Sequence, residues 1–261
     1  MRNRILSLIA VIVMAMACSV KEDRTGCACL LVLDMSPCAN APDNIRIELK
    51  TLDERIEQNF IPGQDSPFYE YPVTKGSCAL SAFLCPREMS SGTDKIIIEE
   101  GENCPELYAS VSVFEALGET AEHQVFLHKH FATVTLDLEE SSWDSQSCAI
   151  RVEGSINGIS LTDLKPTEGK FCYDVPVAGQ ERRTFRLPRQ TQGSVDALCL
   201  QLGAPGRSPQ IFELGKYLSE AGYDWEMEDL LDVEVKVRES EIVIEILSSD
   251  WIIQSTEVIV I

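Results

Sequence analysis

Residues 233–247 read VEVKVRESEIVIEIL and show the clearest periodicity in the chain. Valines at 233, 235 and 237 alternate with charged residues, and isoleucines at 242, 244 and 246 repeat the alternation after the polar turn 239–241. Successive side chains on a strand point to opposite faces, so all of these apolar residues share one face. The stretch is therefore predicted to form a β-hairpin with one buried and one solvated face.

The same period of two recurs along most of the chain. Turn signals such as Pro62-Gly63 and Asn157-Gly158 separate the segments, as in a β-sandwich. Strands are predicted at 30–35, 45–50, 68–73, 79–84, 95–99, 107–114, 125–138, 148–156, 170–175, 184–187 and 197–202. The segment 125–138 is longer than a usual strand, so we expect it to bend or bulge near its middle.

Helical spacing is confined to one region near the C-terminal end. Apolar residues recur at helical intervals over 211–220, and Gly222 supplies a stop signal. A second, shorter helical turn is predicted over 226–231. The fold class is therefore all-β, with one or two short helices in its C-terminal part.

A polar stretch interrupts the strand pattern near the middle of the chain. Residues 139–147 are serines, acidic residues and Gln146 around a single Trp143. Strand-like segments flank this stretch on both sides, so we interpret it as an interdomain linker. The predicted units are a signal peptide at 1–17, an N-terminal domain at 18–143 and a C-terminal domain at 144–261.

The N-terminal end has the features of a secretory signal. Arg2 and Arg4 precede a short apolar run that ends Ala15-Met16-Ala17-Cys18. A basic start, an apolar stretch too short to span a bilayer and small residues before the cleavage site are typical of such signals. A cysteine at this position resembles a bacterial lipobox, which predicts cleavage before Cys18 and attachment of acyl chains to Cys18. The alternative is an ordinary secreted protein with an incidental cysteine.

The composition restricts the partners that the protein could bind. The chain has 261 residues, of which 44% are hydrophobic and 25% charged, and a formal net charge of −20 at pH 7. Such a surface repels phosphate backbones, so nucleic-acid binding is not expected. It also repels anionic lipid, so any attachment to the outer membrane must come from acyl chains.

Cysteine and histidine could in principle hold a metal ion. Nine cysteines remain beyond Cys18, an odd number, and they show no paired zinc spacing. We expect buried thiols and a few disulfides, without an assigned pairing. His128 and His130 would share a face of a strand, which permits a two-histidine metal site or two polar residues on a wet face. The second reading is favoured, so no metal or other cofactor is predicted.

The sequence has no recognisable catalytic motif. It lacks a Gly-x-Ser-x-Gly elbow, a His-Glu-x-x-His helix and a phosphate-binding glycine loop. Carboxylate pairs such as Glu99-Glu100 could serve a glycosidase, but they arise by chance in a chain with 42 acidic residues. We predict that the protein is not an enzyme and has no catalytic residue.

The last six residues, TEVIVI at 256–261, have high β propensity. An apolar strand at a terminus must be paired, or it becomes a template for aggregation. One interpretation is a strand that closes its own sheet. The other is a strand, carrying Val258 and Val260, that pairs with another subunit.

Three segments resemble the FimB/Mfa2-type fimbrial anchoring lipoproteins of the Bacteroidales. They are Cys18–Arg24 running through Cys27-Ala28-Cys29 into 30–34, the stretch 159–173 around Lys165–Gly169, and 212–225 together with the terminal 251–261. The resemblance covers both ends of the chain after Cys18, whereas 50–145 matches only as a β-rich region. It implies two tandem transthyretin-like β-sandwiches.

The resemblance also implies a function. The family's members are lipidated outer-membrane proteins that hold the base of a fimbria, and subunits of such pili join by strand exchange. The implied partners are the fimbrial stalk or other pilus subunits, together with the outer membrane through lipid on Cys18. The alternatives are a surface lipoprotein that binds a ligand or glycan through exposed aromatics, such as Phe68–Tyr71, and a pilus tip adhesin.

Overall fold

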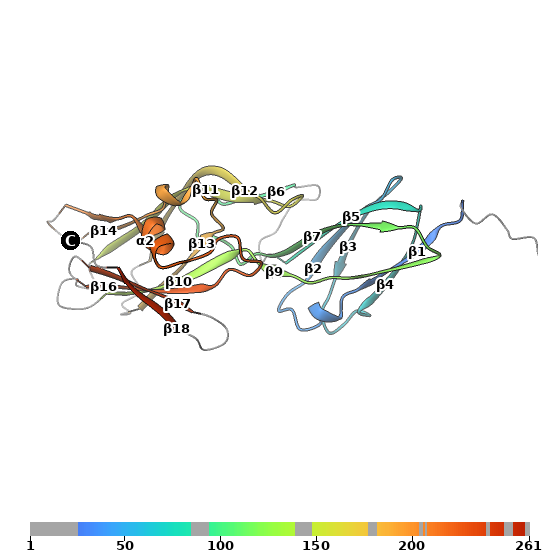
Figure 1. Cartoon of the computed structure of the whole chain (residues 1–261), viewed down its shortest axis with the longest axis horizontal. Coiled ribbons are helices and arrows are strands. Elements are labelled where there is room, and N and C mark those ends of the chain that lie inside the picture. Colours follow the sequence, from blue (N-terminus) through green and yellow to red (C-terminus); the bar gives the residue numbers. More distant parts are fainter. Residues whose placement is uncertain are drawn as a thin grey trace, which may run out of the picture.

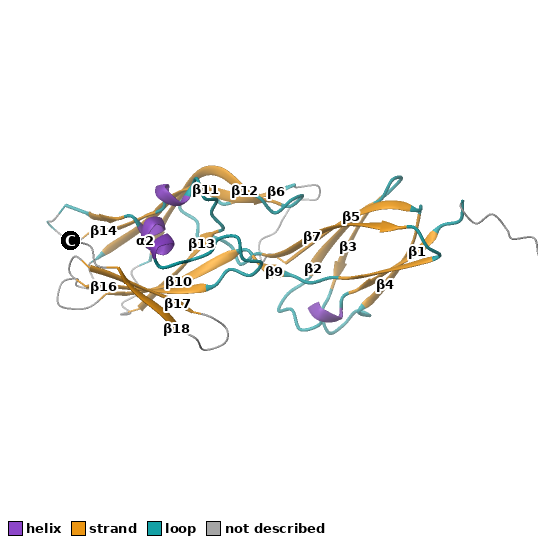
Figure 2. Ribbon diagram, viewed as in Figure 1, coloured by secondary structure: helices purple, strands orange, loops and turns teal. Residues whose placement is uncertain are grey.

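The computed structural model describes residues 26–84, 94–138, 148–176, 182–203, 206, 208–238, 241–247 and 253–258. They form two β-rich lobes placed end to end, which gives the molecule an elongated shape (Figure 1). Strands dominate both lobes (Figure 2). The predicted all-β fold class is therefore confirmed.

The first lobe contains two sheets that face each other. One has three strands in the order β4-β1-β8, and the other has five in the order β3-β2-β5-β7-β9. The strands are β1 (Cys29–Asp34), β2 (Ile45–Lys50), β3 (Arg55–Phe60), β4 (Phe68–Val73), β5 (Gly76–Leu84), β7 (Tyr108–Ala116), β8 (Thr120–Gln124) and β9 (His128–Lys129). The short 3-10 helix η1 (Ser36–Cys38) follows β1. Side chains such as Leu31, Ile47 and Leu80 form a core of their own between these sheets.

The second lobe repeats this plan with longer sheets. Its sheets have the orders β13-β10-β16-β17-β18 and β12-β11-β14-β15. The strands are β10 (Phe131–Leu138), β11 (Ala149–Ser160), β12 (Pro166–Val175), β13 (Arg182–Pro188), β14 (Cys199–Gly203), β15 (Gln210–Phe212), β16 (Asp232–Arg238), β17 (Glu241–Leu247) and β18 (Ile253–Val258). The helix α2 (Leu214–Glu220) and the 3-10 helix η2 (Val195–Ala197) pack on its core.

The hairpin predicted from 233–247 forms as β16 and β17. Val233 pairs with Ile246, and Val235 pairs with Ile244, in an antiparallel register. Val233, Val235 and Ile244 are fully buried. On the opposite face, Lys236 donates a hydrogen bond of 2.8 Å to Glu245. The predicted buried face is confirmed, whereas the opposite face is only partly solvated, because Val243 is buried and Lys236 and Glu245 are half-buried.

The two lobes share a strand topology that the sequence does not reveal. The first strand of each lobe lies between an antiparallel and a parallel neighbour: β1 lies between β4 and β8, and β10 lies between β13 and β16. The facing sheets correspond as well, because β3-β2-β5-β7 has the same order of connection as β12-β11-β14-β15. The described chain is thus a structural repeat, extended in the second lobe by β17 and β18.

The structure places two predicted elements differently and bears out a third prediction. Residues 226–231 form turns and bends rather than a helical turn. The helix predicted over 211–220 begins only at Leu214, because Gln210–Phe212 pair with β14 as a strand. The third concerns 125–138, which breaks at His130 into β9 and β10. The expected interruption is therefore present.

The place of β10 affects the domain boundary. The predicted boundary at 143/144 puts Phe131–Leu138 in the N-terminal domain, but these residues pair with β13 and β16 of the second lobe. In addition, β6 (Lys95–Ile97) pairs with β11 of the second lobe. We therefore propose a boundary near residue 130, crossed by a segment that includes β6. The predicted linker 139–147 lies outside the described residues.

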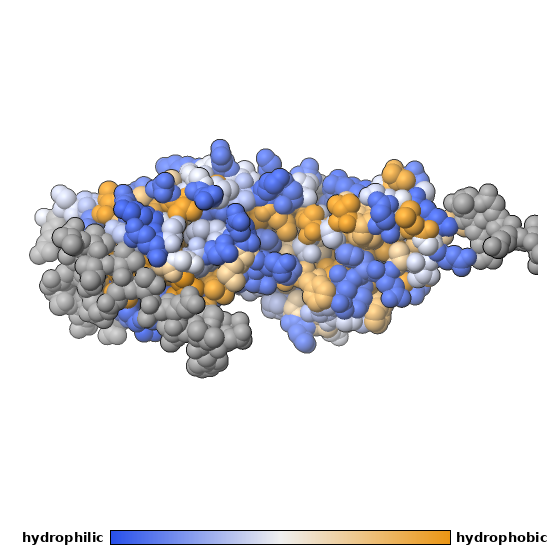
Figure 3. Space-filling model, viewed as in Figure 1, coloured by the Kyte–Doolittle hydropathy of each residue, from blue (hydrophilic) through white to orange (hydrophobic). Residues whose placement is uncertain are grey.

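The visible face of the molecule carries both polar and apolar residues (Figure 3). Figure 3 shows hydrophilic residues over much of the visible face of both lobes, with apolar residues between them. Among the described residues, no helix is long and apolar enough to cross a membrane.

Candidate functional site

The predicted site residues fall at the two ends of the chain. Cys18 and the signal at 1–17 lie outside the described residues, as does Val260. Val258 is the last residue of β18, and its backbone pairs with Ile242 of β17. The structure therefore describes one of the two predicted partner-strand residues, and it does not test the lipid site.

The strand β18 lies at the edge of its sheet. It pairs antiparallel with β17 over six residues, from Leu247↔Ile253 to Ile242↔Val258. Within the described residues, no strand pairs with its other edge. The terminal segment thus closes its own sheet and also presents an edge at which a further strand could add.

The first lobe has a second sheet edge, at β8. This strand pairs with β1 alone among the described strands. Its residues alternate between exposed and half-buried, and Ala121 and His123 form the half-buried set. Sequence analysis missed this strand because TAEHQ has no strongly apolar residue. The only sequence feature that could have indicated this strand is its position, since just three residues separate it from β7.

A cluster of polar contacts joins the two lobes where the chain passes from β9 to β10. Arg189 donates hydrogen bonds to the backbone oxygens of Trp225 (2.6 Å), Met227 (2.7 Å) and Glu228 (3.0 Å) and to His130 Nδ1 (3.2 Å). A guanidinium with several carbonyl acceptors fixes the loop after α2 against the start of β10. Burial lowers the pKa of Arg189 from its ordinary value.

The second anchor of this junction is Asp229. Its carboxylate accepts a hydrogen bond of 2.7 Å from the backbone N–H of Lys129 and lies 3.2 Å from His128 Nδ1. The backbone N–H of Leu230 also donates to the Lys129 carbonyl (3.0 Å). Hydrogen bonds to its oxygens lower the pKa of Asp229, although burial opposes this shift. The strand β9 and the loop after α2 are therefore held together by hydrogen bonds donated from each to the other.

The two histidines considered as metal ligands have other roles in this junction. His130 Nδ1 accepts from Arg189, so its Nε2–H is the group that faces the Ala109 carbonyl at 3.3 Å. Burial, together with the charge of Arg189, lowers the pKa of His130 to about 4. His128 instead faces Asp229. The described residues contain no group of three or more potential metal ligands.

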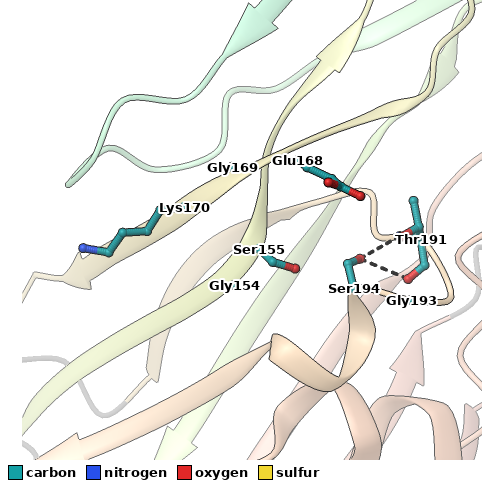
Figure 4. Close-up of a pocket in the computed structure, with 8 residues that line it drawn as sticks. All are labelled: Gly154, Ser155, Glu168, Gly169, Lys170, Thr191, Gly193 and Ser194. Carbon is teal, nitrogen blue, oxygen red and sulfur yellow. Dashed lines mark hydrogen bonds between the residues drawn. The ribbon is translucent and has the colours of Figure 1, made fainter.

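A polar cavity lies beside the irregular part of the β11–β12 ladder. Its volume is about 490 Å³, and Ser155, Glu168, Thr191 and Ser194 are among its lining residues. Figure 4 shows these side chains around a common space, with Lys170 extending away from it. Register shifts between Gly154 and Gly158 open the ladder at this point. Hydroxyl and carboxylate groups of this kind can bind a polar ligand.

The cysteines confirm the predicted buried thiols, but the predicted disulfides are not present among the described residues. Cys29, Cys38 and Cys78 are free and buried, and Cys38 Sγ lies 3.3 Å from the Val125 carbonyl oxygen. Burial raises the pKa of Cys38 and of Cys78. A raised pKa disfavours the thiolate, so neither residue is a reactive nucleophile.

The aromatic segment Phe68–Tyr71 is only partly available to a ligand. Tyr69 and Tyr71 are half-buried and pack against the first core, with their rings stacked 6.3 Å apart. The Tyr69 hydroxyl donates to Asp65 (3.1 Å), and burial raises its pKa to about 12. Among the aromatic residues of this segment, Phe68 alone is exposed. The arrangement matches a strand with one aromatic face in the core.

Comparisons with known proteins address the fold. No family model matches the sequence, and no curated protein matches it. Among solved structures, the fimbrial anchor protein Mfa2 from Porphyromonas gingivalis has a TM-score of 0.54 at 14% identity, covering 88% of this chain and 100% of that chain. A candidate adhesin from Bacteroides ovatus has a TM-score of 0.59 at 16% identity, covering 92% and 98%.

A third similar structure is a candidate polysaccharide-binding protein from Bacteroides thetaiotaomicron. Its TM-score is 0.59 at 10% identity, and the match covers 85% of this chain and 99% of that chain. At such identities the likeness concerns the fold. It confirms that this chain is similar in structure to a fimbrial anchor protein, as the three sequence segments predict.

Proposed function

We propose that this protein is a lipid-anchored subunit that holds a fimbria at the outer membrane and joins its subunits by β-strand exchange. The observation that carries the proposal is the fold shared with the anchor protein Mfa2 over 88% of the chain. The adhesin-like neighbours support a fimbrial or cell-surface location more generally. The proposed role is structural, with no catalytic step.

The proposed membrane attachment rests on Cys18. The sequence Ala15-Met16-Ala17-Cys18 follows a short apolar run with two preceding arginines. One acyl chain gives marginal binding, whereas two or more anchor a protein stably. A lipidated Cys18 would thus be sufficient to retain this acidic protein at a membrane surface that its charge otherwise avoids.

The proposed partner site is the edge of β18. Its backbone groups pair with β17 on one side, and no described strand pairs with them on the other. The sequence from Val258 through Val260 to Ile261 is apolar and has no proline or glycine. Main-chain hydrogen bonds along such an edge supply affinity, and alternate side chains supply specificity.

The lipid proposal is tested with Cys18→Ala in whole cells. We expect the variant to fold and to leave the membrane fraction for the soluble fraction. Cys27→Ala is the matched control, because Cys27 is an exposed free thiol a few residues further along the chain. Equal incorporation of labelled fatty acid into wild type and Cys18→Ala would contradict the proposal.

The partner proposal is tested by deleting 256–261 and measuring both thermal unfolding and capture of sheared fimbriae. If the strand only closes its own sheet, the second lobe should lose several kcal/mol of stability, because a paired strand is removed. If it docks with a partner, its own transition should persist while capture is lost. Normal unfolding with undiminished capture would overturn a contact at β18.

A specific observation also favours a second function, the binding of a glycan or other surface ligand. The polar cavity between the β11–β12 bulge and the loop 191–194 offers hydroxyl groups and the Glu168 carboxylate (Figure 4). A structural neighbour is a candidate polysaccharide-binding protein. Thr191→Trp would fill the cavity from an exposed position, so loss of glycan binding with unchanged fimbrial capture would support this function.

A further inference from the structure

The repeat between the two lobes reveals one position that is filled in the second lobe and open in the first. In the second lobe, β17 pairs with the outer edge of β16, the parallel neighbour of the first strand. The corresponding strand in the first lobe is β8, the parallel neighbour of β1. Among the described residues, no strand pairs with the outer edge of β8.

Side-chain burial shows what this missing neighbour changes. Val233, Val235 and Val237 of β16 are fully buried, because Ile242, Ile244 and Ile246 of β17 pack beside them. The inward residues of β8, Ala121 and His123, remain half-buried.

His123 covers the core of the first lobe only partly on the side next to β8. Its ring stacks on Phe114 at 4.2 Å, and its Nε2 lies 2.8 Å from Ser112 Oγ. Phe114 and Ala121 are likewise only partly buried against the first core. Two large apolar residues next to the ends of β8, Leu117 and Phe126, are 64% and 50% exposed. The side of the sandwich next to β8 therefore has apolar area that a further strand would cover.

The backbone of β8 has the right polarity to accept a strand. The Leu30 N–H donates to the Glu119 carbonyl (2.8 Å), and the Val125 N–H donates to the Asp34 carbonyl (2.9 Å). In a parallel ladder alternate residues bond to the neighbour, so Ala121 and His123 also face β1. The backbone groups of Thr120, Glu122 and Gln124 therefore point away from β1.

We propose that the outer edge of β8 is a second docking site, which accepts an antiparallel β-strand from another protein chain. The antiparallel direction follows from β17, which runs antiparallel to β16 at the corresponding position. Apolar side chains of the incoming strand would cover Phe114 and Ala121. Its outward side chains would be lysine or arginine, because Glu119 and Glu122 are exposed on a chain of net charge −20.

This inference goes beyond the anchoring role, because it concerns the first lobe and does not depend on lipid at Cys18. It is therefore tested on purified full-length protein carrying Cys18→Ala. The probe is a capped peptide of alternating valine and lysine, about six residues long, the usual length of a strand. A scrambled peptide of the same composition controls for attraction to the acidic surface.

The readout is amide hydrogen exchange, residue by residue. In the free protein, Ala121 and His123 should exchange slowly because they bond to β1, whereas Glu122 and Gln124 should exchange fast. The alternating peptide should slow amide exchange at Glu122 and Gln124 by at least tenfold, whereas the scrambled peptide should leave it unchanged. Unchanged exchange at these two amides under saturating peptide would overturn the proposal.

Glu122→Pro provides the matched variant. Its N–H points away from β1, so proline removes a donor at the outer edge and spares the β1–β8 ladder. We expect slow exchange at Ala121 and His123 to persist, while the peptide binds roughly fivefold to tenfold more weakly. Glu122→Ala keeps the N–H and should bind at least three times more tightly than Glu122→Pro. Equal affinities for the two variants would place the peptide elsewhere, at β7 or β18.

Discussion

The two lobes begin with the same arrangement of strands and differ in how it ends. In both, the first strand lies between an antiparallel and a parallel neighbour. The second lobe continues with β17 and β18, whereas among the described strands the corresponding sheet of the first lobe ends at β8. The parallel strand is consequently an interior strand in one lobe and an edge strand in the other.

This difference explains the composition of the two strands. An interior strand buries its inward side chains completely, which suits Val233, Val235 and Val237 of β16. An edge strand keeps partial contact with water, which suits the polar sequence Thr120–Gln124 of β8. The negative charge of Glu122 disfavours pairing of this edge with an acidic strand and favours a basic one. The neighbour of a strand thus determines its composition more than its place in the repeat does.

The largest effect is expected from an aspartate on the inward face of each parallel strand. Val235→Asp would bury an unpaired carboxylate in the core, and we expect it to abolish the unfolding transition of the second lobe, with a loss of more than about 4 kcal/mol. Ala121→Asp should cost about 1 kcal/mol, because the half-buried position can hydrate. Calorimetry of both variants provides the measurement.

The effects of Val235→Asp and Ala121→Asp test directly whether β16 and β8 differ in burial. Val235→Asp should leave the first lobe's transition in place, because each lobe has its own core. If Ala121→Asp proves as damaging as Val235→Asp, then β8 is covered in the free chain, and the contrast between the lobes disappears.

The next largest effect is expected at the junction, where Arg189 connects the second lobe's loops to the residue between β9 and β10. Arg189→Met should lower the free energy of unfolding by about 3 kcal/mol, because the backbone carbonyls of Trp225, Met227 and Glu228 lose a charged donor. Urea denaturation measures this loss. Arg182→Met is the control: its ion pair with Glu234 (3.1 Å) is largely exposed on the arginine side, so its loss should be under about 1 kcal/mol.

Much of the fold could be predicted from the sequence where period two is strong. The strand 45–50 alternates strictly, and the hairpin 233–247 does so except at Val243 and Leu247; in both, the alternating apolar residues are buried. The interruption in 125–138 was predictable from length alone. Predicting strands from alternating apolar and polar residues succeeded here because one face of the sheet is more buried than the other.

Other features leave no local signal in the sequence. The strands β3 and β8 are edge strands with few apolar residues, so their pairing comes from tertiary contact. The assignment of β10 to the second lobe depends on partners about fifty and one hundred residues further along the chain, as seen in the pairs Val134↔Phe185 and Val134↔Val233. For the same reason, the contacts of Arg189 could not be inferred from its neighbours in the sequence.

A smaller effect is expected from pH, and it reports on the junction between the lobes. The pKa of His130 is lowered from 6.5 to about 4 by burial and by Arg189, so the unfolded chain binds the proton more readily. Stability should therefore fall as pH drops from about 6.5 towards 4, by roughly 2 kcal/mol between pH 7 and 5. His130→Gln can keep both hydrogen bonds without titrating, so urea midpoints of this variant should change less over that interval. A profile identical to wild type would exclude His130 as the source of the loss.

The smallest effect concerns β6, the segment of the first half of the chain that pairs with the second lobe. Gly158 of β11 pairs with Ile97, and a Cβ at Gly158 would lie 2.3 Å from the Ile96 carbonyl oxygen. Gly158→Ala should therefore displace β6 and cost about 1 kcal/mol, because only a three-residue strand has to move.

The decisive readout for this substitution is amide exchange in both lobes. We expect faster exchange at Ile96, whose partner across the ladder is Ile159, and unchanged exchange in β2 and β5. Gly193→Ala, with no atom within 4 Å of the added Cβ, is the control. If β2 and β5 loosen together with β6, the segment is an integral part of the first lobe, and the boundary near residue 130 is wrong. If only β6 and its contacts on β11 respond, β6 belongs energetically to the second lobe, whose sheet it extends.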